Sequence, residues 1–403
     1  MKYARRPIAA LLAALCAVSV AAGLTVTRAA AGPTSDPATA AGFGGTWLAH
    51  QINSSGFIPA SAPATGANLS GTVDAALALA AANVGGAAFT RALNYMHGQI
   101  DAFVKSGADD VPGALAKLIL LAKVAGEDAT KFGGTAAAND LVARLNATKR
   151  TTGTDSGLFG VQDPAFDGAF RQSLAIIALK AVGSPPVDAV NWLSTQQCPD
   201  KGWQSYRADT TAACTATDVA SFAGEDTNST AIAEQAFRSL SLTPPKGDPL
   251  DFLKAAQNTD GGFGFLKGTG TDANSTGLVI QAVVAGGEDP TAGRWAIAGG
   301  TPLTALLGLQ LGCDAAAADR GAFDYQTESP LKANLLATVQ AVPGAARKPF
   351  PLATGAPAAA EPVACDTTPA PTTTTTTAAT TTTTTVPASP VANAVVATPK
   401  FVG

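Results

Sequence analysis

Two short stretches hold the residue types that could do chemistry, Asp226-Thr-Asn-Ser-Thr230 and Asp272-Ala-Asn-Ser-Thr276. Each places a carboxylate and a carboxamide directly ahead of an apolar, alanine-rich run. Asp and Asn at such a point are strong helix N-cap residues, because their side-chain oxygens accept hydrogen bonds from the first backbone N–H groups of the helix. The same groups could also contact a ligand. The candidate rim residues are therefore Asp226, Asn228, Asp272 and Asn274.

Aromatic residues lie close to these two stretches in the sequence. Beside carboxylates and carboxamides they would form a surface suited to a lipid, an isoprenoid or a glycan, because aromatic side chains offer a large apolar face and, in Tyr and Trp, a polar tip. The aromatic candidates for the rim are Trp203, Tyr206, Phe263, Phe265 and Tyr325.

Other patterns that carry chemistry are incomplete. The two histidines, His50 and His97, are far from any cysteine, which disfavours a zinc site. The glycine-rich stretch 261–267 lacks the Ser or Thr that follows the lysine of a phosphate-binding loop. A serine nucleophile would need a G-x-S-x-G pattern, which is missing. The sequence therefore predicts no catalytic residue, no metal site and no cofactor.

One pattern recurs along the chain: an aromatic or leucine residue, then a glutamine, then a Gly-Phe or Gly-Trp pair. In three copies the glycine follows the glutamine at the same spacing. A degenerate copy at 155–160 and a longer one at 306–323 extend the series. We interpret each glutamine-to-glycine segment as a structural clasp between an outer and an inner helix. The clasp residues are Gln51, Gly56, Gln197, Gly202, Gln257 and Gly262.

An alanine- and leucine-rich segment bounded by Gly or Pro follows each turn, which predicts helices rather than strands. The predicted helices cover residues 71–82, 113–126, 170–182, 229–242, 275–285 and 330–342. A single helix–turn–helix unit cannot bury its apolar face alone, so such units must stack. The sequence therefore predicts an all-α array of about six repeats between residues 43 and 344.

This repeat resembles the unit of the prenyltransferase and squalene-cyclase superfamily, and the chain looks like a non-canonical secreted bacterial member of these terpenoid cyclase-like proteins. The resemblance implies an α/α toroid, of the α6/α6 type, in which inner helices ring a funnel and outer helices surround them. The family's catalytic motifs do not carry over. Asp109-Asp110 lacks the first Asp of the acid motif D-x-D-D, and Gly113 replaces the last Asp of D-D-x-x-D. The prenyltransferase zinc ligands and the thioester sequence G-C-G-E-Q are also missing.

A toroid without a recognised reactive group is expected to bind its ligand rather than transform it. We therefore expect an exported, non-catalytic protein that holds a small apolar or amphipathic ligand, such as an isoprenoid or lipid, or a cell-envelope glycan, at the toroid mouth. A more distant resemblance to the intrinsic factor and transcobalamin carriers suggests a corrinoid, but the chain has no room for their second domain. Two alternatives stay open: an extracytoplasmic terpenoid cyclase or prenyltransferase-like enzyme with an atypical acid such as Asp109, Asp163 or Asp167, and a displayed protein-interaction module on a threonine-rich stalk.

Both ends of the chain indicate export. Lys2, Arg5 and Arg6 precede an apolar run with a signal-peptidase site near Ala31. Beyond that site 22 basic and 30 acidic residues remain, and this acidic balance disfavours a nucleic-acid partner. No later apolar run reaches the ~20 residues of a transmembrane helix. We expect a monomer, secreted or associated with the cell wall.

Four cysteines remain after this cleavage, and an oxidising compartment favours two disulfides among them. We expect Cys198–Cys214 and Cys313–Cys365, since each pair closes an otherwise loose stretch. The predicted organisation is a signal peptide at 1–31, a flexible segment at 32–42, the toroid at 43–344, a Pro/Ala-rich strap at 345–365 and a disordered Thr/Pro-rich tail at 366–403.

Overall fold

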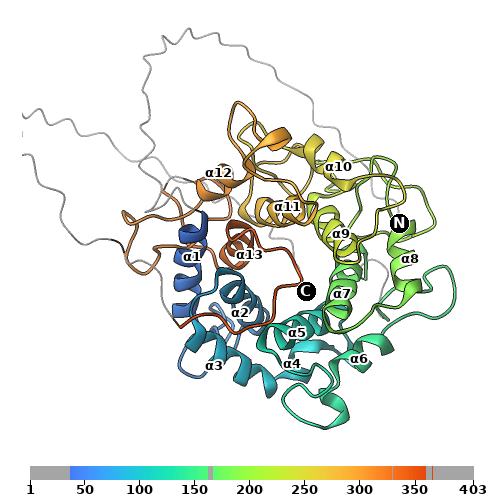
Figure 1. Ribbon diagram of the computed structural model, residues 1–403, viewed down its shortest axis with the longest axis horizontal. Helices are drawn as coiled ribbons and strands as arrows, with labels where there is room; N and C mark the ends of the chain where they lie inside the picture. Colours follow the sequence, from blue (N-terminus) through green and yellow to red (C-terminus); the bar gives the residue numbers. More distant parts are fainter. Residues whose placement is uncertain (1–36, 162–166, 329, 360–364, 366–403) are drawn as a thin grey trace, which may run out of the picture. The chain divides into compact units, whose positions relative to one another are not determined.

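The computed structural model describes residues 37–161, 167–328, 330–359 and 365. Within them, a set of inner helices packs side by side in a closed circle, each against the next and the last against the first (Figure 1). These inner helices are α2 (Leu69–Ala82), α5 (Pro112–Ala125), α7 (Ala169–Val182), α9 (Thr227–Ser239), α11 (Ala273–Ala285) and α13 (Leu335–Ala345). The predicted α/α toroid is therefore confirmed.

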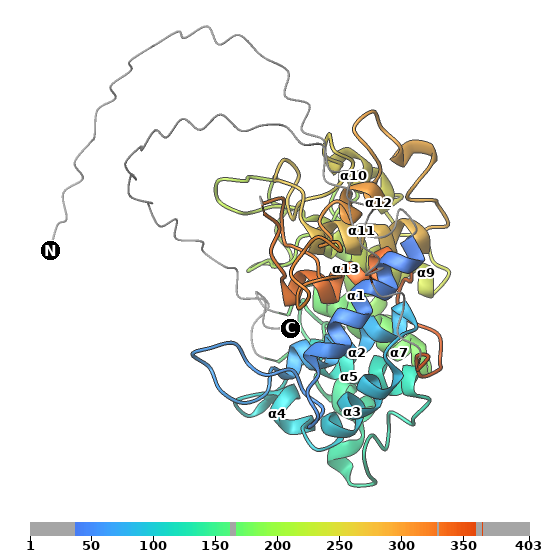
Figure 2. The same cartoon turned by 90° about the vertical axis from the view of Figure 1, so that its left-hand side faces the viewer.

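A second set of helices lies outside this ring. Figure 2 shows α1 in front of α2 and α13, the two inner helices that it contacts. The outer helices are α1 (Pro37–Gln51), α3 (Gly86–His97), α4 (Ile100–Val104), α6 (Leu141–Ala147), α8 (Val187–Thr195), α10 (Pro249–Ala256) and α12 (Pro302–Leu307). Two 3-10 turns, η1 (Ala137–Asn139) and η2 (Gly293–Trp295), and an antiparallel pair, β1 (Lys105–Ser106) and β2 (Asp109–Asp110), complete the described elements.

Helix α1 begins before residue 43, where we expected the toroid to start. Asp110 of β2 receives two hydrogen bonds from the Arg144 guanidinium, at 2.6 and 2.8 Å. The Asp109-Asp110 pair therefore lies in a hairpin outside the inner ring and is held by an ion pair.

Four inner helices begin with the same arrangement, which we call the cap–threonine unit. An Asx side chain at the N-cap accepts a hydrogen bond from the backbone N–H three residues later, at 2.6–3.0 Å. The residue four positions after the cap is a threonine, whose hydroxyl accepts the backbone N–H of a buried residue in the preceding turn, at 2.9–3.0 Å. The four pairs are Asn68 and Thr72, Asp226 and Thr230, Asp272 and Thr276, and Asn334 and Thr338.

Two predicted helix ends are corrected by the structure. The last inner helix begins at Leu335 and not at residue 330, because the Asn334 side chain caps it. Helix α9 ends at Ser239 and not at residue 242, because Ser241 takes a left-handed backbone conformation with φ 57°.

Glutamine side chains connect neighbouring repeats. The Gln257 amide donates to the carbonyl of Gly261 in its own turn, at 3.0 Å, and to that of Trp295 in the next unit, at 2.9 Å. Gln197 and Gln310 each donate in the same way to two carbonyls, one in the glutamine's own turn and one in another unit. For Gln310 the second acceptor is the Ala40 carbonyl of α1, at 2.8 Å. This last contact joins the final repeat to the first and closes the ring.

The first copy of the clasp lies one residue out of register with the others, which corrects the equal spacing read from the sequence. Ile58, and not Phe57, donates its N–H to the threonine, as Trp203 and Phe263 do in their units. The turn after Gln51 is thus one residue longer, and among the described residues the Gln51 amide donates only to Trp47 of its own helix.

Because of this shift of one residue, the structurally equivalent positions in the three turns differ from those that the sequence suggested. Gly56 matches Lys201 and Gly261, which share its left-handed backbone with φ of 92°, 80° and 93°. Gly202 and Gly262 each lie one position later in the turn. A Cβ on Gly56 would stand 2.3 Å from the Arg91 carbonyl oxygen, so the close approach to α3 requires glycine there.

The chain after α13 crosses the end of the ring opposite the caps. Lys348 and Phe350 bond the side chains of Gln281 in α11 and Gln235 in α9, at 2.7 and 2.9 Å. Further along, Gly355 donates to the Val124 carbonyl of α5 at 2.9 Å. In Figure 1 this segment passes across the space that the inner helices surround.

Both disulfides form with the expected pairing, Cys198–Cys214 and Cys313–Cys365. The second joins the turn after α12 to the end of the described C-terminal segment. Two disulfides are compatible with a location outside the cytoplasm. Among the described residues, no helix combines the length and apolar character needed to cross a membrane.

The clasp contacts lead to a stability prediction. Replacing Gln257 by Ala leaves two part-buried carbonyls without their donor, and we expect it to lower the free energy of unfolding by about 1–3 kcal/mol. Gln51→Ala is the matched control, because its amide donates to the Trp47 carbonyl of the same helix at 3.4 Å and to no other unit in the described part of the chain. Thermal melts of both variants test this. Equal losses of stability in the two variants would show that the hydrogen bond from Gln257 to the next unit does not stabilise the fold.

Candidate functional site

The caps of α9 and α11 bring two carboxyl groups to neighbouring positions on one rim of the ring. Asp226 Oδ1 accepts the Ser229 N–H at 2.6 Å, and its Oδ2 accepts the N–H and hydroxyl of Ser205 at 2.9 and 2.7 Å. Asp272 accepts the N–H and hydroxyl of Ser275 at 2.7 and 2.9 Å. The two carboxyl-bearing residues are only 1% and 2% exposed.

A short segment of backbone links the two caps. The N–H of Thr227, directly after Asp226, donates to the Phe265 carbonyl at 2.9 Å. The N–H of Asp272 donates to the carbonyl of Phe263, two residues earlier in the same segment, at 2.9 Å. Since the segment 263–265 bonds the starts of both helices, the caps of α9 and α11 lie next to each other.

Burial dominates the electrostatics of both groups. It raises the pKa of Asp226 and of Asp272 to about 6, although hydrogen bonds from serine and backbone donors partly offset this rise. A carboxyl group with such a pKa exchanges its proton near neutral pH. That property is what a general acid or base requires.

Two tyrosines lie beside these carboxyls and reach solvent. Tyr206 is 44% and Tyr325 is 40% exposed. Burial of its ring, with the nearby Asp272 charge, raises the pKa of Tyr325 to about 12, and burial together with Asp226 raises that of Tyr206. Both phenols therefore stay protonated at neutral pH and can donate hydrogen bonds.

Two of the other aromatic candidates do not reach the surface, and the third does so only in part. Trp203 and Phe263 are completely buried and pack in the core, so they cannot contact a ligand there. Phe265 is partly buried and stacks on Phe222 with ring centroids 5.0 Å apart. The prediction treated all five aromatics alike, because adjacency in sequence does not distinguish inward from outward side chains.

The two predicted asparagines occupy the second position of their helices. Asn228 is half-buried in α9, and the Thr227 hydroxyl contacts its Oδ1 at 3.3 Å. Asn274 is 8% exposed in α11, and its Oδ1 has no hydrogen-bond partner among the residues that the structure describes.

An ion pair at the start of α7 adjoins this rim. Arg171 bonds Asp167 at 3.2 Å, and both are buried. A Cβ on Gly168 would lie 1.7 Å from the Ser205 carbonyl oxygen, so the start of α7 touches the segment that holds Asp226. Sequence reasoning missed Arg171, although its i, i+4 spacing from Asp167 was a usable signal. Asp163, the other acid considered, lies outside the described residues.

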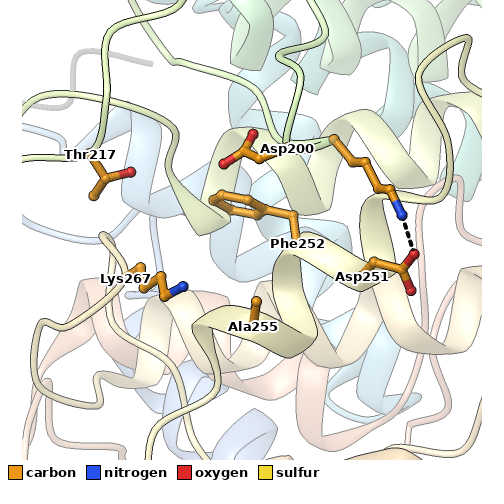
Figure 3. A pocket seen from close by; sticks show the side chains of 7 residues that line it. Asp200, Thr217, Asp251, Phe252, Ala255 and Lys267 are labelled. Carbon is orange, nitrogen blue, oxygen red and sulfur yellow. Dashed lines mark hydrogen bonds and ion pairs between the residues drawn. The ribbon is translucent and has the colours of Figure 1, made fainter.

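A separate cleft of about 330 Å³ lies against the outer helix α10 (Figure 3). Lys201 and Arg294 pair with Asp251 there and hold its pKa below the ordinary range, so this carboxylate stays ionised. The Asp251 carboxylate is therefore suited to a structural ion pair and not to the role of a general acid. The cleft is lined by Asp200, Lys201, Thr217, Asp251, Phe252, Ala255 and Lys267.

The cap–threonine units provide an internal comparison for the two carboxyls. Asn68 and Asn334 cap α2 and α13 with the same bond that Asp226 and Asp272 make in α9 and α11. Asn and Asp are about equally good N-caps, so the cap bond itself does not need a negative charge. Placing an ionised carboxylate in a buried position costs free energy that a carboxamide avoids.

No protein-family model matches this chain, and no curated protein sequence matches it. Solved structures do match. The unsaturated glucuronyl hydrolase from Bacillus sp. GL1, responsible for the degradation of glycosaminoglycan, is 12% identical, with 77% of this chain and 96% of that chain covered and a TM-score of 0.50. A structure with the glycan dGlcA-Glc-Rha-Glc gives the same values. A glycosidase in complex with glucose is 14% identical, with a TM-score of 0.47. At such identities the likeness establishes the toroid fold, of the same general class as the terpenoid cyclases.

This comparison corrects the expected function. We expected a non-catalytic protein holding a small ligand, with a terpenoid cyclase or a display module as alternatives. The solved toroids that match include the unsaturated glucuronyl hydrolases instead. Missing cyclase motifs therefore say nothing against catalysis on this scaffold, because a fold hosts different chemistries through different sites.

The raised pKa values lead to a prediction on stability. Between pH ~4 and ~6 the folded protein keeps protons on Asp226 and Asp272 that unfolded aspartates, with a pKa near 3.9, have released. This contribution to stability is therefore present at low pH and is lost as the pH rises through 6. An asparagine at either position has no such dependence, so the Tm of Asp226→Asn or Asp272→Asn, relative to wild type, should rise from pH 4.5 to pH 7.5.

Thermal melts across this pH range are the measurement. Asp128→Asn is the control, because hydrogen bonds from Thr130 lower the pKa of the exposed Asp128, so its contribution to stability changes only below pH ~4 and its Tm difference should stay constant from pH 4.5 to pH 7.5. A pH-independent Tm difference for the two cap variants would mean that their carboxyls titrate alike in the folded and unfolded chains.

Proposed function

We propose that this protein is an extracytoplasmic glycan-processing enzyme that hydrolyses a glycosidic bond at the rim formed by α9 and α11, with Asp226 and Asp272 as its acid–base carboxyls. One observation carries the proposal: buried carboxyls stand at two adjacent caps, whereas two other caps of the same ring use asparagine. The glycoside hydrolases among the solved toroids support a glycan as the substrate class.

Hydrolysis of a glycosidic bond needs a proton donor for the leaving oxygen and a carboxylate that assists water or the sugar. Burial gives both aspartates a pKa suited to holding and releasing a proton near neutral pH. Both carboxyls are almost fully buried, whereas the neighbouring Tyr206 and Tyr325 are 44% and 40% exposed. One aspartate in its protonated form would supply, through the phenol beside it, the proton that the leaving glycosidic oxygen takes, and the other, as a carboxylate, would accept a proton from the water that attacks the sugar carbon.

The same tyrosines support glycan binding. Their half-exposed rings offer flat apolar faces with a polar tip at the rim. Asn228 and Asn274 add carboxamides, which donate to and accept from sugar hydroxyls. This combination fits a hydroxylated ring better than a purely apolar molecule.

The location outside the cytoplasm rests on the two disulfides and on the export signal expected near Ala31. The signal and the threonine-rich tail lie outside the described residues. A threonine-rich stalk would hold the toroid near cell-envelope glycans.

The test measures hydrolysis of a panel of oligosaccharides by release of reducing ends. We expect Asp226→Asn and Asp272→Asn each to lower kcat by about 10²–10⁴-fold, the usual value of general acid–base catalysis. Asparagine keeps the cap bond, as Asn68 and Asn334 show, so both variants should remain folded. Asn334→Asp is the matched control and should leave the rate unchanged. Wild-type activity that survives in both cap variants would contradict the proposal.

A further inference from the structure

A stacked pair of aromatic rings extends from the cap of α9 into solvent. Phe222 is 51% exposed, and its ring lies on that of Phe265 with the centroids 5.0 Å apart and 9° between the planes. The Phe265 carbonyl accepts the N–H of Thr227, the residue directly after Asp226, at 2.9 Å. Since Phe265 covers one face of the Phe222 ring and half of Phe222 remains exposed, the opposite face is available to a ligand.

The loop that carries Phe222 is fixed by its own hydrogen bonds. Asp218 and Ala223 exchange two backbone bonds, at 2.9 and 3.0 Å. The Asp218 carboxylate also accepts the Ala220 N–H at 3.0 Å and the Ser221 hydroxyl at 2.5 Å. A ring that the free protein already holds in place loses little conformational entropy when a ligand binds to it.

Phe222 also has a strained backbone. Its φ of 53° is in the left-handed region, where a bulky residue is an outlier and glycine or asparagine is accommodated more easily. Strained residues cluster at ligand-binding and catalytic sites, where the surrounding structure holds them in place. Folding alone does not favour a half-exposed phenylalanine on such a backbone, because glycine takes the same conformation without strain. Contact with a ligand gives this side chain a role.

The two loops that form the ring pair also line the cleft against α10. Thr217, in the loop of Phe222, contributes a hydroxyl to the lining. Lys267, in the loop of Phe265, contributes an ammonium group (Figure 3). Both groups can bond the hydroxyls of a sugar. A ligand on the ring pair therefore has hydrogen-bonding partners on the same two loops.

This combination fits a sugar ring. A pyranose has C–H groups on its faces and hydroxyls around its edge, so it can cover an aromatic ring while its hydroxyls bond polar side chains nearby. A protein partner would need a much larger apolar area than Phe222 and Val219, the exposed large apolar residues of this loop, provide. The bond from Thr227 to Phe265 makes the ring pair continuous with the proposed cleavage site at the Asp226 cap.

We infer that the ring pair Phe222–Phe265 binds a sugar unit of the glycan chain next to the units at the cleavage site, so that this protein prefers longer oligosaccharides to disaccharides. A disaccharide supplies only the units on either side of the cleaved bond and leaves the ring pair empty. The inference rests on the proposed function and adds the chain length of its substrate.

The test compares a disaccharide with a hexasaccharide of the same sugar and linkage, in linear chains of glucose, of N-acetylglucosamine and of glucuronic acid. We expect Phe222→Gly to raise KM for the hexasaccharide about 3–10-fold, the contribution of one aromatic contact, and to leave its kcat unchanged. The constants for the disaccharide should not change. Phe222→Tyr keeps the ring and should behave as wild type. Val187→Ala is the control for loss of an exposed apolar side chain, because Val187 is 74% exposed in the outer helix α8.

Calorimetric titration with the same hexasaccharides separates binding from catalysis. It uses the Asp226→Asn background, in which the chain should stay uncleaved. Binding that Phe222→Gly weakens and Phe222→Tyr keeps would support the inference even if no chain is hydrolysed, in which case only the proposed function fails. If wild type and Phe222→Gly hydrolyse hexasaccharides equally well, the proposed function stands and the inference is overturned. No binding of any hexasaccharide, or an equal change for disaccharide and hexasaccharide, would also overturn it.

Discussion

The hydroxyl of one threonine per cap–threonine unit holds each turn to the helix that follows it. In α2, α9 and α13 this hydroxyl donates to the carbonyl of its own N-cap residue at 2.7 Å, while it accepts the N–H of a residue in the turn. In α11 it accepts the Phe263 N–H at 3.0 Å. Buried backbone groups must be paired, so this one contact fixes where the inner helix begins and how the outer one reaches it.

Because the units share this geometry, their helix starts gather at one rim. The N-terminal end of a helix attracts negative charge, and backbone N–H groups there donate to any acceptor within reach. At Asp226 and Asp272 these effects favour the ionised carboxylate, yet burial outweighs them and leaves a raised pKa. The residues that cap α9 and α11 are therefore also the residues whose pKa is raised.

Either Asn or Asp can cap an inner helix, but only Asp adds a group that can gain or lose a proton. Asn68 and Asn334 show that the ring closes with neutral caps, and the charge appears only where α9 and α11 are neighbours. The second oxygen of Asp226 also holds Ser205, the residue before the half-exposed Tyr206. The carboxyl with the raised pKa therefore also positions a surface tyrosine through Ser205.

The sequence by itself determined the all-α class, five of the six inner helices to within a few residues, and the disulfide pairing. Local signals were enough for these features: Asx caps, glycine-bounded alanine-rich runs and cysteines that bracket loops. It also located Asp226 and Asp272 as caps. It misplaced the start of the last helix and the register of the first clasp, because a one-residue difference in a turn leaves no mark in composition.

Only the tertiary structure decided which side chains share the rim. Sequence adjacency placed Trp203 and Phe263 beside Tyr206 and Tyr325, but the first two are buried in the core and the last two reach solvent. The contact of Gln310 with Ala40, which closes the ring, joins opposite ends of the toroid. Burial and ring closure depend on contacts between residues far apart in the chain, and burial in turn sets the pKa of the two aspartates.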